Sequence, residues 1–398
     1  MALSCAMNET DNVNVTKSDA ISLAPSTAAT TRASISDINS LKDPAGNGFV
    51  VYATSGNAAS WFTKIDGHNN HVWNDTESKW GFKSSVHWPD EANAYPMNFF
   101  AFYPQLPNTV IKTLGDIYPN ISLNVVIPSD KKDQLDLLAG KKSTANKPAS
   151  GTLTMTFKHI LSKVNFSVSV DNTDYEAYVL ALSLKNLHTT NTYDVKNAAW
   201  DPTTNGRESF EYYNHFTVNA SGYTEKKFDK IAKTLFFDKA SNEHLMLLPQ
   251  SPTVWNTDSK DATVDEPKDD EAFVQLLYRS TYLTDKDFIG FEVADNHGGY
   301  ATSQLKNDNY HGPLYVKVGY SLNLDWEEGK GYQYNIPLPG QTGGRLLDDH
   351  LYDDKGNRTD LKVPGGKVPE TILGDNDEIR LDPTVTNWDD QAIEDIKD

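Results

Sequence analysis

Residues 152–170 read TLTMTFKHILSKVNFSVSV and carry the clearest structural pattern in the first half of the chain. Apolar residues alternate with polar ones up to Phe157, and the alternation resumes on the opposite phase from Val164. Because successive side chains of a strand point to opposite faces, this pattern predicts two β-strands that each bury one face. The change of phase predicts a turn or bulge within residues 159–163.

Several flanking stretches have the same strand-like character. Residues 49–53 and 123–127 are short apolar runs that predict further strands. Residues 96–104 read PMNFFAFYP, which is apolar on both faces and bounded by prolines, so a buried strand in the middle of a sheet is expected there. Residues 133–140 are interpreted as one short helical turn.

The second half contains a longer alternating segment. Apolar side chains occupy every second position from Leu314 to Trp326, a Gly-containing turn follows, and the alternation continues from Tyr332 to Leu338. This arrangement predicts a β-hairpin. A last strand is expected over residues 378–388, interrupted by Pro383.

The composition supports an all-β fold and argues against several functions. The 398 residues include 19 Tyr, 16 Phe and 8 Trp, residue types that favour strands. The formal net charge of −19 repels nucleic acid and anionic lipid, so neither is expected as a partner. No apolar run approaches the roughly 20 residues of a spanning helix.

Length and turn signals predict two antiparallel β-sandwich domains, since a domain typically has ~100–200 residues. The expected division is a leader over residues 1–32, an N-terminal sandwich over 33–172 and a C-terminal sandwich over 173–398. Two polar insertions, 256–272 and 340–377, are expected as exposed loops of the C-terminal sandwich.

No motif for catalysis, phosphate binding or zinc binding occurs in the chain. His68 and His71 are three residues apart but lack a second pair of ligands. Asp353–Asn357 is typical of a tight turn and lacks the full spacing of a calcium loop. We therefore expect a protein that is not an enzyme and has no cofactor, no catalytic residue and no metal site.

Two further features bear on function. The tryptophans Trp61, Trp73, Trp80 and Trp88 could stack on sugar rings, although such residues more often fix loops to a core. Cys5 is the one cysteine, so no internal disulfide can form. The preceding triplet Ala-Leu-Ser is similar to the one that precedes the lipid-bearing cysteine of bacterial lipoproteins; an unmodified cysteine in a polar tail is the alternative.

The order of several short segments carries a resemblance across nearly the whole chain. The segments are Thr31–Ala33, Asn98–Pro104, Asp136–Ala139, Phe157–Val164, Leu245–Gln250 and Tyr332–Ile336. Together they resemble the fimbrillin-like lipoproteins, or type V pilins, of Gram-negative anaerobes. The most telling are Phe157–Val164 and Leu245–Gln250.

This resemblance implies two transthyretin-like, Greek-key β-sandwiches and a subunit of a surface fimbria at the outer membrane. It further implies lipid on Cys5 and cleavage between Arg32 and Ala33 by an arginine-specific protease. The cut would expel a first strand, and a strand from another fimbrial subunit would fill the vacated groove. A host glycan or protein is a further possible partner. The residues implied for the expelled strand are Val13, Val15, Ile21 and Leu23.

The resemblance also implies a C-terminal donor strand, for which the candidates are Ile379, Leu381, Val385 and Trp388. The tail after Trp388 is acidic and has little to offer an apolar groove. The last strand is therefore also open to a second interpretation, in which it stays in its own domain and the chain is a tip or accessory subunit. A surface glycan-binding lipoprotein that uses exposed tryptophans is the alternative function.

Overall fold

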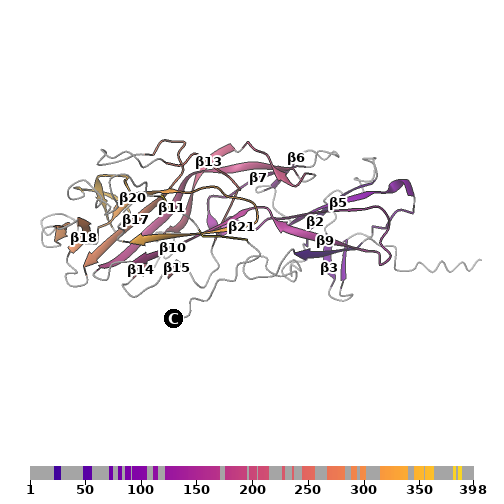
Figure 1. The fold of residues 1–398 in the computed structure, drawn as a ribbon, viewed down its shortest axis with the longest axis horizontal. Coiled ribbons are helices and arrows are strands. Elements are labelled where there is room, and N and C mark those ends of the chain that lie inside the picture. Colours follow the sequence, from indigo (N-terminus) through magenta and orange to yellow (C-terminus); the bar gives the residue numbers. More distant parts are fainter. Residues whose placement is uncertain are drawn as a thin grey trace, which may run out of the picture. The chain divides into compact units, whose positions relative to one another are not determined.

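The computed structural model describes most of the chain, and the structural statements below concern the described residues. They contain β-strands and two short 3-10 helices, η3 (Ala92–Ala94) and η4 (Lys131–Asp133), and no α-helix (Figure 1). The all-β prediction is confirmed. The described residues are 22–27, 48–55, 71–74, 79–82, 86–90, 92–104, 111–114, 122–170, 175–194, 197–203, 205–214, 226–228, 235–236, 244–255, 267–282, 288–293, 296–301, 314–338, 345–353, 355–362, 380–381 and 384–387.

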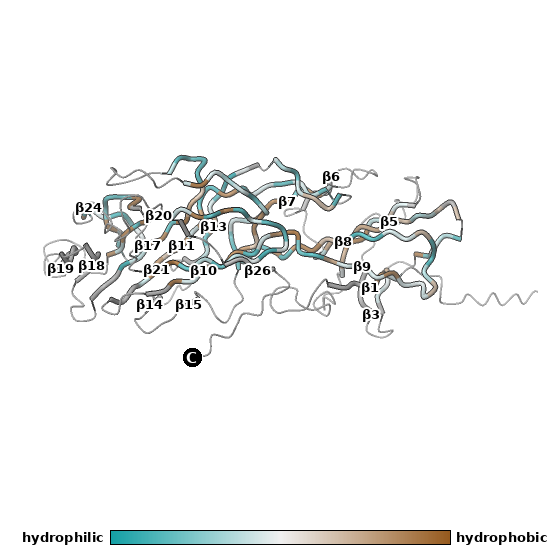
Figure 2. The backbone as a smooth tube through the Cα atoms, viewed as in Figure 1, coloured by the Kyte–Doolittle hydropathy of each residue, from teal (hydrophilic) through white to brown (hydrophobic). Residues whose placement is uncertain are grey.

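The chain divides into two compact units that are not continuous in sequence. The first unit comprises residues 1–26, 41–105 and 140–157, and the second comprises 27–40, 106–139 and 158–398. Along the described strands of both units, hydrophobic and hydrophilic residues mix at short intervals, as expected for strands with one buried face (Figure 2).

The first unit is built on a five-stranded sheet and a separate two-stranded ribbon. In spatial order the sheet strands are β1 (Ser22–Thr27), β9 (Thr152–His159), β8 (Leu138–Thr144), β5 (Met97–Tyr103) and β2 (Val50–Ser55). The ribbon pairs β3 (His71–Asn74) with β4 (Lys79–Phe82). The strand expected over residues 96–104 is β5, which has a neighbour on each side as predicted.

Alternation in β9 organises the core of the first unit. Buried side chains alternate with exposed or half-buried ones along its eight residues, and Met155 and Phe157 are fully buried. The ring of Phe157 lies 5.1 Å from that of Phe49, which in turn lies 5.3 Å from Trp80. The strand ends at His159, and β10 begins at Ser162, so the predicted change of phase is confirmed at Ile160 and Leu161.

The second unit contains a five-stranded sheet around β10. Its order is β15-β10-β21-β26, with β16 also pairing with β10. The pairing of β10 with β21 is parallel, whereas the other pairs of this sheet for which a register is defined are antiparallel. The bounds are β10 (Ser162–Val170), β15 (Leu235–Phe236), β16 (Leu245–Leu247), β21 (Lys330–Leu338) and β26 (Thr384–Asn387).

A twelve-stranded sheet forms the second layer of this unit. Its centre is β11 (Tyr175–Asp194), which pairs with β7, β12, β13, β14 and β17. The other bounds are β6 (Ile111–Leu114), β7 (Ser122–Val126), β12 (Ala199–Trp200), β13 (Asn205–Asn214), β14 (Lys226–Phe228), β17 (Phe273–Tyr282), β18 (Phe288–Val293), β19 (Asn296–Ala301), β20 (Val316–Leu322), β22 (Arg345–Leu346) and β25 (Arg380–Leu381). A separate hairpin pairs β23 (His350–Tyr352) with β24 (Arg358–Lys362).

Aromatic side chains join the two layers of the second unit. Phe166 on β10 packs edge-on against Tyr212 on β13 at 5.1 Å and stacks on Tyr334 of β21 at 5.3 Å. The hydroxyl of Tyr334 donates to the carbonyl of Asn323 at 2.7 Å, and the indole N–H of Trp326 donates to that hydroxyl at 2.9 Å. The buried polar atoms of these rings thus have partners, as burial requires.

The predicted hairpin over residues 314–338 is wrong. Its two strands belong to different sheets, because β20 pairs with β17, β22 and β25, whereas β21 pairs with β10 and β26. The apolar alternation is present in both strands, but alternation records which side chains are buried and not which strand is the neighbour. Residues 323–329 therefore connect two sheets and do not close a hairpin.

The domain boundary expected at residue 172 also differs from the structure. The second unit already includes residues 106–139 and begins its long final segment at residue 158. The reason is that β10 pairs with β16 and β21, and β7 pairs with β11, so strands on both sides of the expected boundary share sheets. A boundary drawn at one position in sequence cannot describe such interleaved units.

Two local expectations need correction as well. The helical turn expected within residues 133–140 is η4, where the side chain of Asp130 accepts the backbone N–H of Lys132 at 3.1 Å. The described part of 340–377 is not simply an exposed loop, since it forms β22, β23 and β24 and buries Leu346 and Leu351. In the other insertion, 256–272, the described end is likewise buried at Ala272.

Candidate strand-exchange site

Strand β1 lies at an edge of the sheet of the first unit. Its residues read SLAPST, and among the described strands β9 is its one neighbour in the sheet. Pro25 has no N–H to donate, which an edge strand tolerates because one side of its backbone has no partner strand. Leu23 is nevertheless completely buried, with 0% of its surface exposed. The strand thus lies at the edge of the sheet, and its Leu23 side chain is part of the core.

Ser22 fixes the start of β1 through two hydrogen bonds within the first unit. Its backbone N–H donates to the carbonyl of Gly151 at 3.3 Å, and its hydroxyl donates to the carbonyl of Trp80 at 2.8 Å. The same Gly151 carbonyl accepts the indole N–H of Trp88 at 2.9 Å. Gly151 has φ of 71°, a conformation that other residues adopt only with strain.

The core beside β1 is aromatic. Phe49, Trp80 and Phe157 form a chain of contacting rings, and Trp88 packs edge-on against Phe99 at 5.7 Å. Removal of β1 would leave one backbone edge of β9 without a partner strand and would uncover apolar surface at the position of Leu23. Such an edge with an apolar groove is a site that can accept an extended strand from another chain.

The C-terminal strands pair inside the second unit. Strand β25 runs parallel to β20, with Ser321 opposite Arg380 and Leu322 opposite Leu381. Strand β26 runs antiparallel to β21, with Lys330 opposite Asn387. The predicted interruption at Pro383 is confirmed, because the described strands flank residues 382–383 and join different sheets.

The structure describes only part of the predicted site. Leu23 is on β1, and Leu381 and Val385 are on β25 and β26. Sequence reasoning missed the positions that hold β1, namely Ser22, Trp80 and Gly151, and no pattern in the sequence relates these distant residues. The predicted residues outside the described part are Cys5, Val13, Val15, Ile21, Arg32, Ala33, Ile379 and Trp388.

Two of the four tryptophans considered for sugar stacking have packing roles. Trp80 is 6% exposed and Trp88 is 3% exposed, so neither ring offers a free face to a sugar. The idea that these two stack on glycans is therefore wrong. Trp61 lies outside the described residues, as does the side chain of Trp73.

One group of possible metal ligands occurs among the described residues, at Asp348, Asp349 and His350. Basic side chains already neutralise it. Arg358 donates to Asp348 at 2.7 Å, and Lys362 pairs with Asp349 at 2.7 Å. Burial alone would raise the pKa of Asp348, but hydrogen bonds led by that from Arg358 lower it to about 2. The cluster is an ion-pair network that fixes the β23–β24 hairpin.

The chain is similar to known fimbrial proteins. The fimbrillin-like family matches residues 31–347. Fimbrium subunit Fim1C of Phocaeicola vulgatus is 25% identical over 282 residues, covering 62% of this chain and 73% of that protein. The crystal structure of a fimbrial protein from Bacteroides vulgatus has a TM-score of 0.56 at 15% identity and covers 93% of this chain and 99% of that one. Among the described residues no helix has the length and apolar character needed to cross a bilayer.

Proposed function

Because the chain belongs to the fimbrillin-like family, we propose that it is a non-catalytic fimbrial subunit that joins other subunits by strand exchange at β1. In this mechanism β1 occupies the edge of β9 until cleavage removes it. A strand from a neighbouring subunit then takes its place. Main-chain hydrogen bonds supply affinity in such joints, and burial of apolar side chains adds to it.

The observation that carries this proposal is the position of Leu23. Leu23 is fully buried although it lies on an edge strand, so it would couple the segment proposed for removal to the core of the first unit. Loss of β1 would expose apolar surface and backbone groups together, and both are costly in water. The vacated site would therefore favour occupation by a strand of similar pattern.

The proposed cleavage site follows β1 closely in sequence. Arg32 follows Thr27, the last residue of β1, by five positions, and the next arginine is Arg207. Cleavage between Arg32 and Ala33 would separate β1 from the rest of the chain without cutting any described strand. Lipid on Cys5 would hold the uncut protein at the outer membrane, and cleavage would also free the subunit from that anchor.

The pairing of β25 and β26 argues against donation of the C-terminal strand. Both already have partners within their own chain, so donation would first require their removal from β20 and β21. A subunit that accepts a strand but keeps its own would stand at one end of a fimbria. We therefore favour a tip or accessory position over a stalk position.

An arginine-specific protease tests this function directly. Digestion of the purified protein should give a product that begins at Ala33, and this product should form complexes with other fimbrial subunits that appear as larger species on size-exclusion chromatography. The Arg32→Gln variant should remain uncut at this position and should stay monomeric under the same conditions. Efficient cleavage after Arg32 without any assembly, or assembly of the uncut variant, would contradict the mechanism.

A further inference from the structure

A small pocket lies on the second unit. Its volume is about 210 Å³, smaller than the ~300–1,000 Å³ of pockets for drug-sized ligands, so it is of a size for a single sugar ring. Strands β11, β13, β17 and β20 form its floor, and the β23–β24 hairpin adds a wall. The lining residues are Ala181, Leu182, Ser183, Lys185, Glu211, Gln275, Leu277, Lys317, Tyr352 and Gly356.

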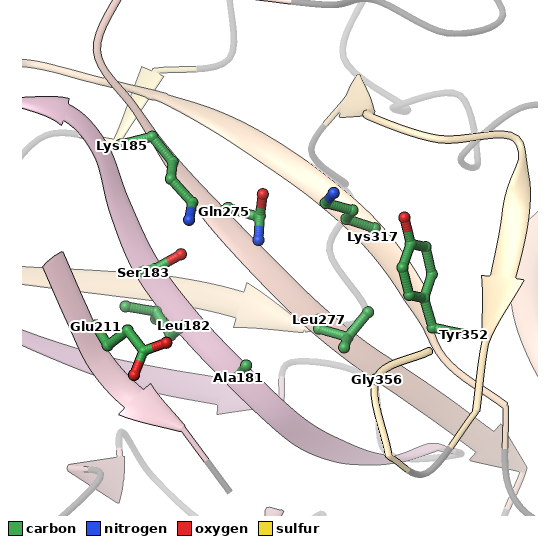
Figure 3. A pocket seen from close by; sticks show the side chains of 10 residues that line it. All are labelled: Ala181, Leu182, Ser183, Lys185, Glu211, Gln275, Leu277, Lys317, Tyr352 and Gly356. Carbon is green, nitrogen blue, oxygen red and sulfur yellow. The ribbon is translucent and has the colours of Figure 1, made fainter. Parts of the chain in front are cut away.

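Strand register brings the polar lining residues together. Ser183 of β11 lies opposite Glu211 of β13 and opposite Gln275 of β17. Leu277 of β17 lies opposite Lys317 of β20. Figure 3 shows the side chains of Gln275 and Lys317 in the same open space as that of Lys185, which comes from β11 two residues after Ser183. Strand pairing within the sheet therefore fixes the positions of these polar residues, and no loop conformation is needed to bring them together.

The two lysines give this pocket a local positive charge on an acidic protein. Within the described part of the chain, neither Lys185 nor Lys317 forms an ion pair or donates a hydrogen bond through its ammonium group. Burial lowers the pKa of Lys185, and the charge of Lys317 lowers it further, against an opposing effect of Glu211. A negatively charged group between the lysines would relieve both unfavourable effects.

The wall of the pocket combines an aromatic ring with a fixed backbone. Lys317 Nζ lies 5.5 Å from the centre of the Tyr352 ring, and the hydroxyl of Tyr352 donates to Asp348 at 2.7 Å. The backbones of Tyr352 and Tyr315 exchange two hydrogen bonds of 2.9 Å. Tyr352 also packs in a buried apolar cluster with Leu277. The ring is therefore held in place before any ligand arrives, which lowers the entropic cost of binding.

We propose that this pocket binds a carboxylated monosaccharide unit of a glycan. The lysines would hold the carboxylate, Ser183 and Gln275 would bond ring hydroxyls, and the largely buried side chains of Leu277 and Tyr352 would line the pocket without offering a free stacking face. The Glu211 carboxylate can accept hydrogen bonds from sugar hydroxyl groups but repels a ligand of high negative charge, which favours a singly charged sugar over a polyanion. This binding role is separate from assembly at β1 and would add adhesion to it.

Calorimetric titration with glucuronic acid and glucose tests the proposal on the intact protein. The two sugars share their ring and differ in the carboxylate, so glucuronic acid should bind at least ~10-fold more tightly, as expected for charge-assisted hydrogen bonds. N-acetylneuraminic acid distinguishes sialylated glycans from glycans with uronic acids, and tight binding of either acid supports the pocket. Equal binding of glucuronic acid and glucose, or tighter binding of inorganic phosphate than of both acidic sugars, overturns it.

Substitution of the two pocket lysines tests whether the sugar binds in this pocket. Lys185→Met and Lys317→Met should each weaken binding of the preferred acidic sugar by ~10-fold or more, because each removes one charged donor. Lys158→Met is the matched control, since Lys158 is an exposed lysine that pairs with Glu328 elsewhere on the unit, and it should leave affinity unchanged. Unchanged affinity in both pocket variants would place the sugar elsewhere and contradict the proposal. If neither variant folds, the comparison of sugars on the unaltered protein decides.

Discussion

At the scale of single residues, Leu23 connects the candidate site to stability. Its side chain is fully buried although, among the described strands, β1 has a partner on one side only. Truncation of a buried leucine loses the transfer free energy of the removed groups and leaves a cavity. The same truncation at an exposed leucine loses little, because its side chain already contacts water.

Leu23→Ala should therefore lower the free energy of unfolding of the intact protein by about 2–5 kcal/mol. Leu135 is 38% exposed, and Leu135→Ala should change it by less than ~0.5 kcal/mol. Urea denaturation of both variants measures the difference. Equal effects of the two substitutions would mean that β1 contributes no more to the core than a surface residue does.

His244 makes stability depend on pH. It is buried, and neither of its ring nitrogens has a hydrogen-bond partner among the described residues. Burial lowers the pKa of His244 to about 3, and the charges of Lys163 and Lys131 contribute to the shift. In the unfolded chain the His244 imidazole binds a proton near pH 6.5, whereas in the folded state it stays neutral down to about pH 3. Protonation therefore favours the unfolded state, and the protein loses stability as the pH falls from 6.5 towards 3.

The contribution of His244 to this slope is at most ~1.4 kcal/mol per pH unit. His244→Leu should flatten the dependence of the unfolding free energy on pH between 6.5 and 3, and His87→Leu, at an exposed histidine, should not. Denaturant melts at a series of pH values provide the comparison. An unchanged slope in His244→Leu would show that other groups control acid stability.

At the scale of elements, β26 decides whether the C-terminal segment belongs to its own chain. It forms four registered residue pairs with β21 in the second unit. A strand kept for donation would be expected to contribute little to the stability of the monomer. A strand that completes its own sheet contributes backbone hydrogen bonds of about 0.5–1.5 kcal/mol each.

Deletion of residues 384–398 should therefore lower the free energy of unfolding of the monomer by about 2 kcal/mol or more. Deletion of residues 388–398, which leaves β26 intact, is the control and should have little effect. Thermal or urea melts distinguish the two shortened proteins. If both are as stable as the full chain, β26 is dispensable to its own unit and the donor interpretation gains support.

The sequence could predict where several strands lie but not which strands pair with one another. Alternation identified the strands around Phe157, Val164 and Tyr320 because burial on one face leaves a local pattern. It assigned β20 and β21 to one hairpin, whereas the structure places them in separate sheets. The parallel pairing of β10 with β21 joins residues more than 160 positions apart, and no local pattern records such a contact.

At the scale of the whole molecule, the two units are interleaved in sequence because strands from both sides of the expected boundary share sheets. Length and turn signals could indicate two bodies but not their discontinuous composition. The resemblance implied Leu23 as part of an exchanged strand, and this role stays a prediction. The hydrogen bond between Ser22 and Gly151 joins positions that only folding brings together. The lysine pocket was unpredictable for the same reason, since its residues come from separate strands.

Hydrogen exchange along β9 tests the central claim, that β1 covers an edge which another subunit can take over. The amide protons of β9 that face β1 should be protected in the intact protein and should exchange rapidly after cleavage at Arg32 and loss of residues 22–27. They should become protected again when the cleaved subunit assembles. Unchanged protection of β9 through cleavage and assembly would contradict the claim.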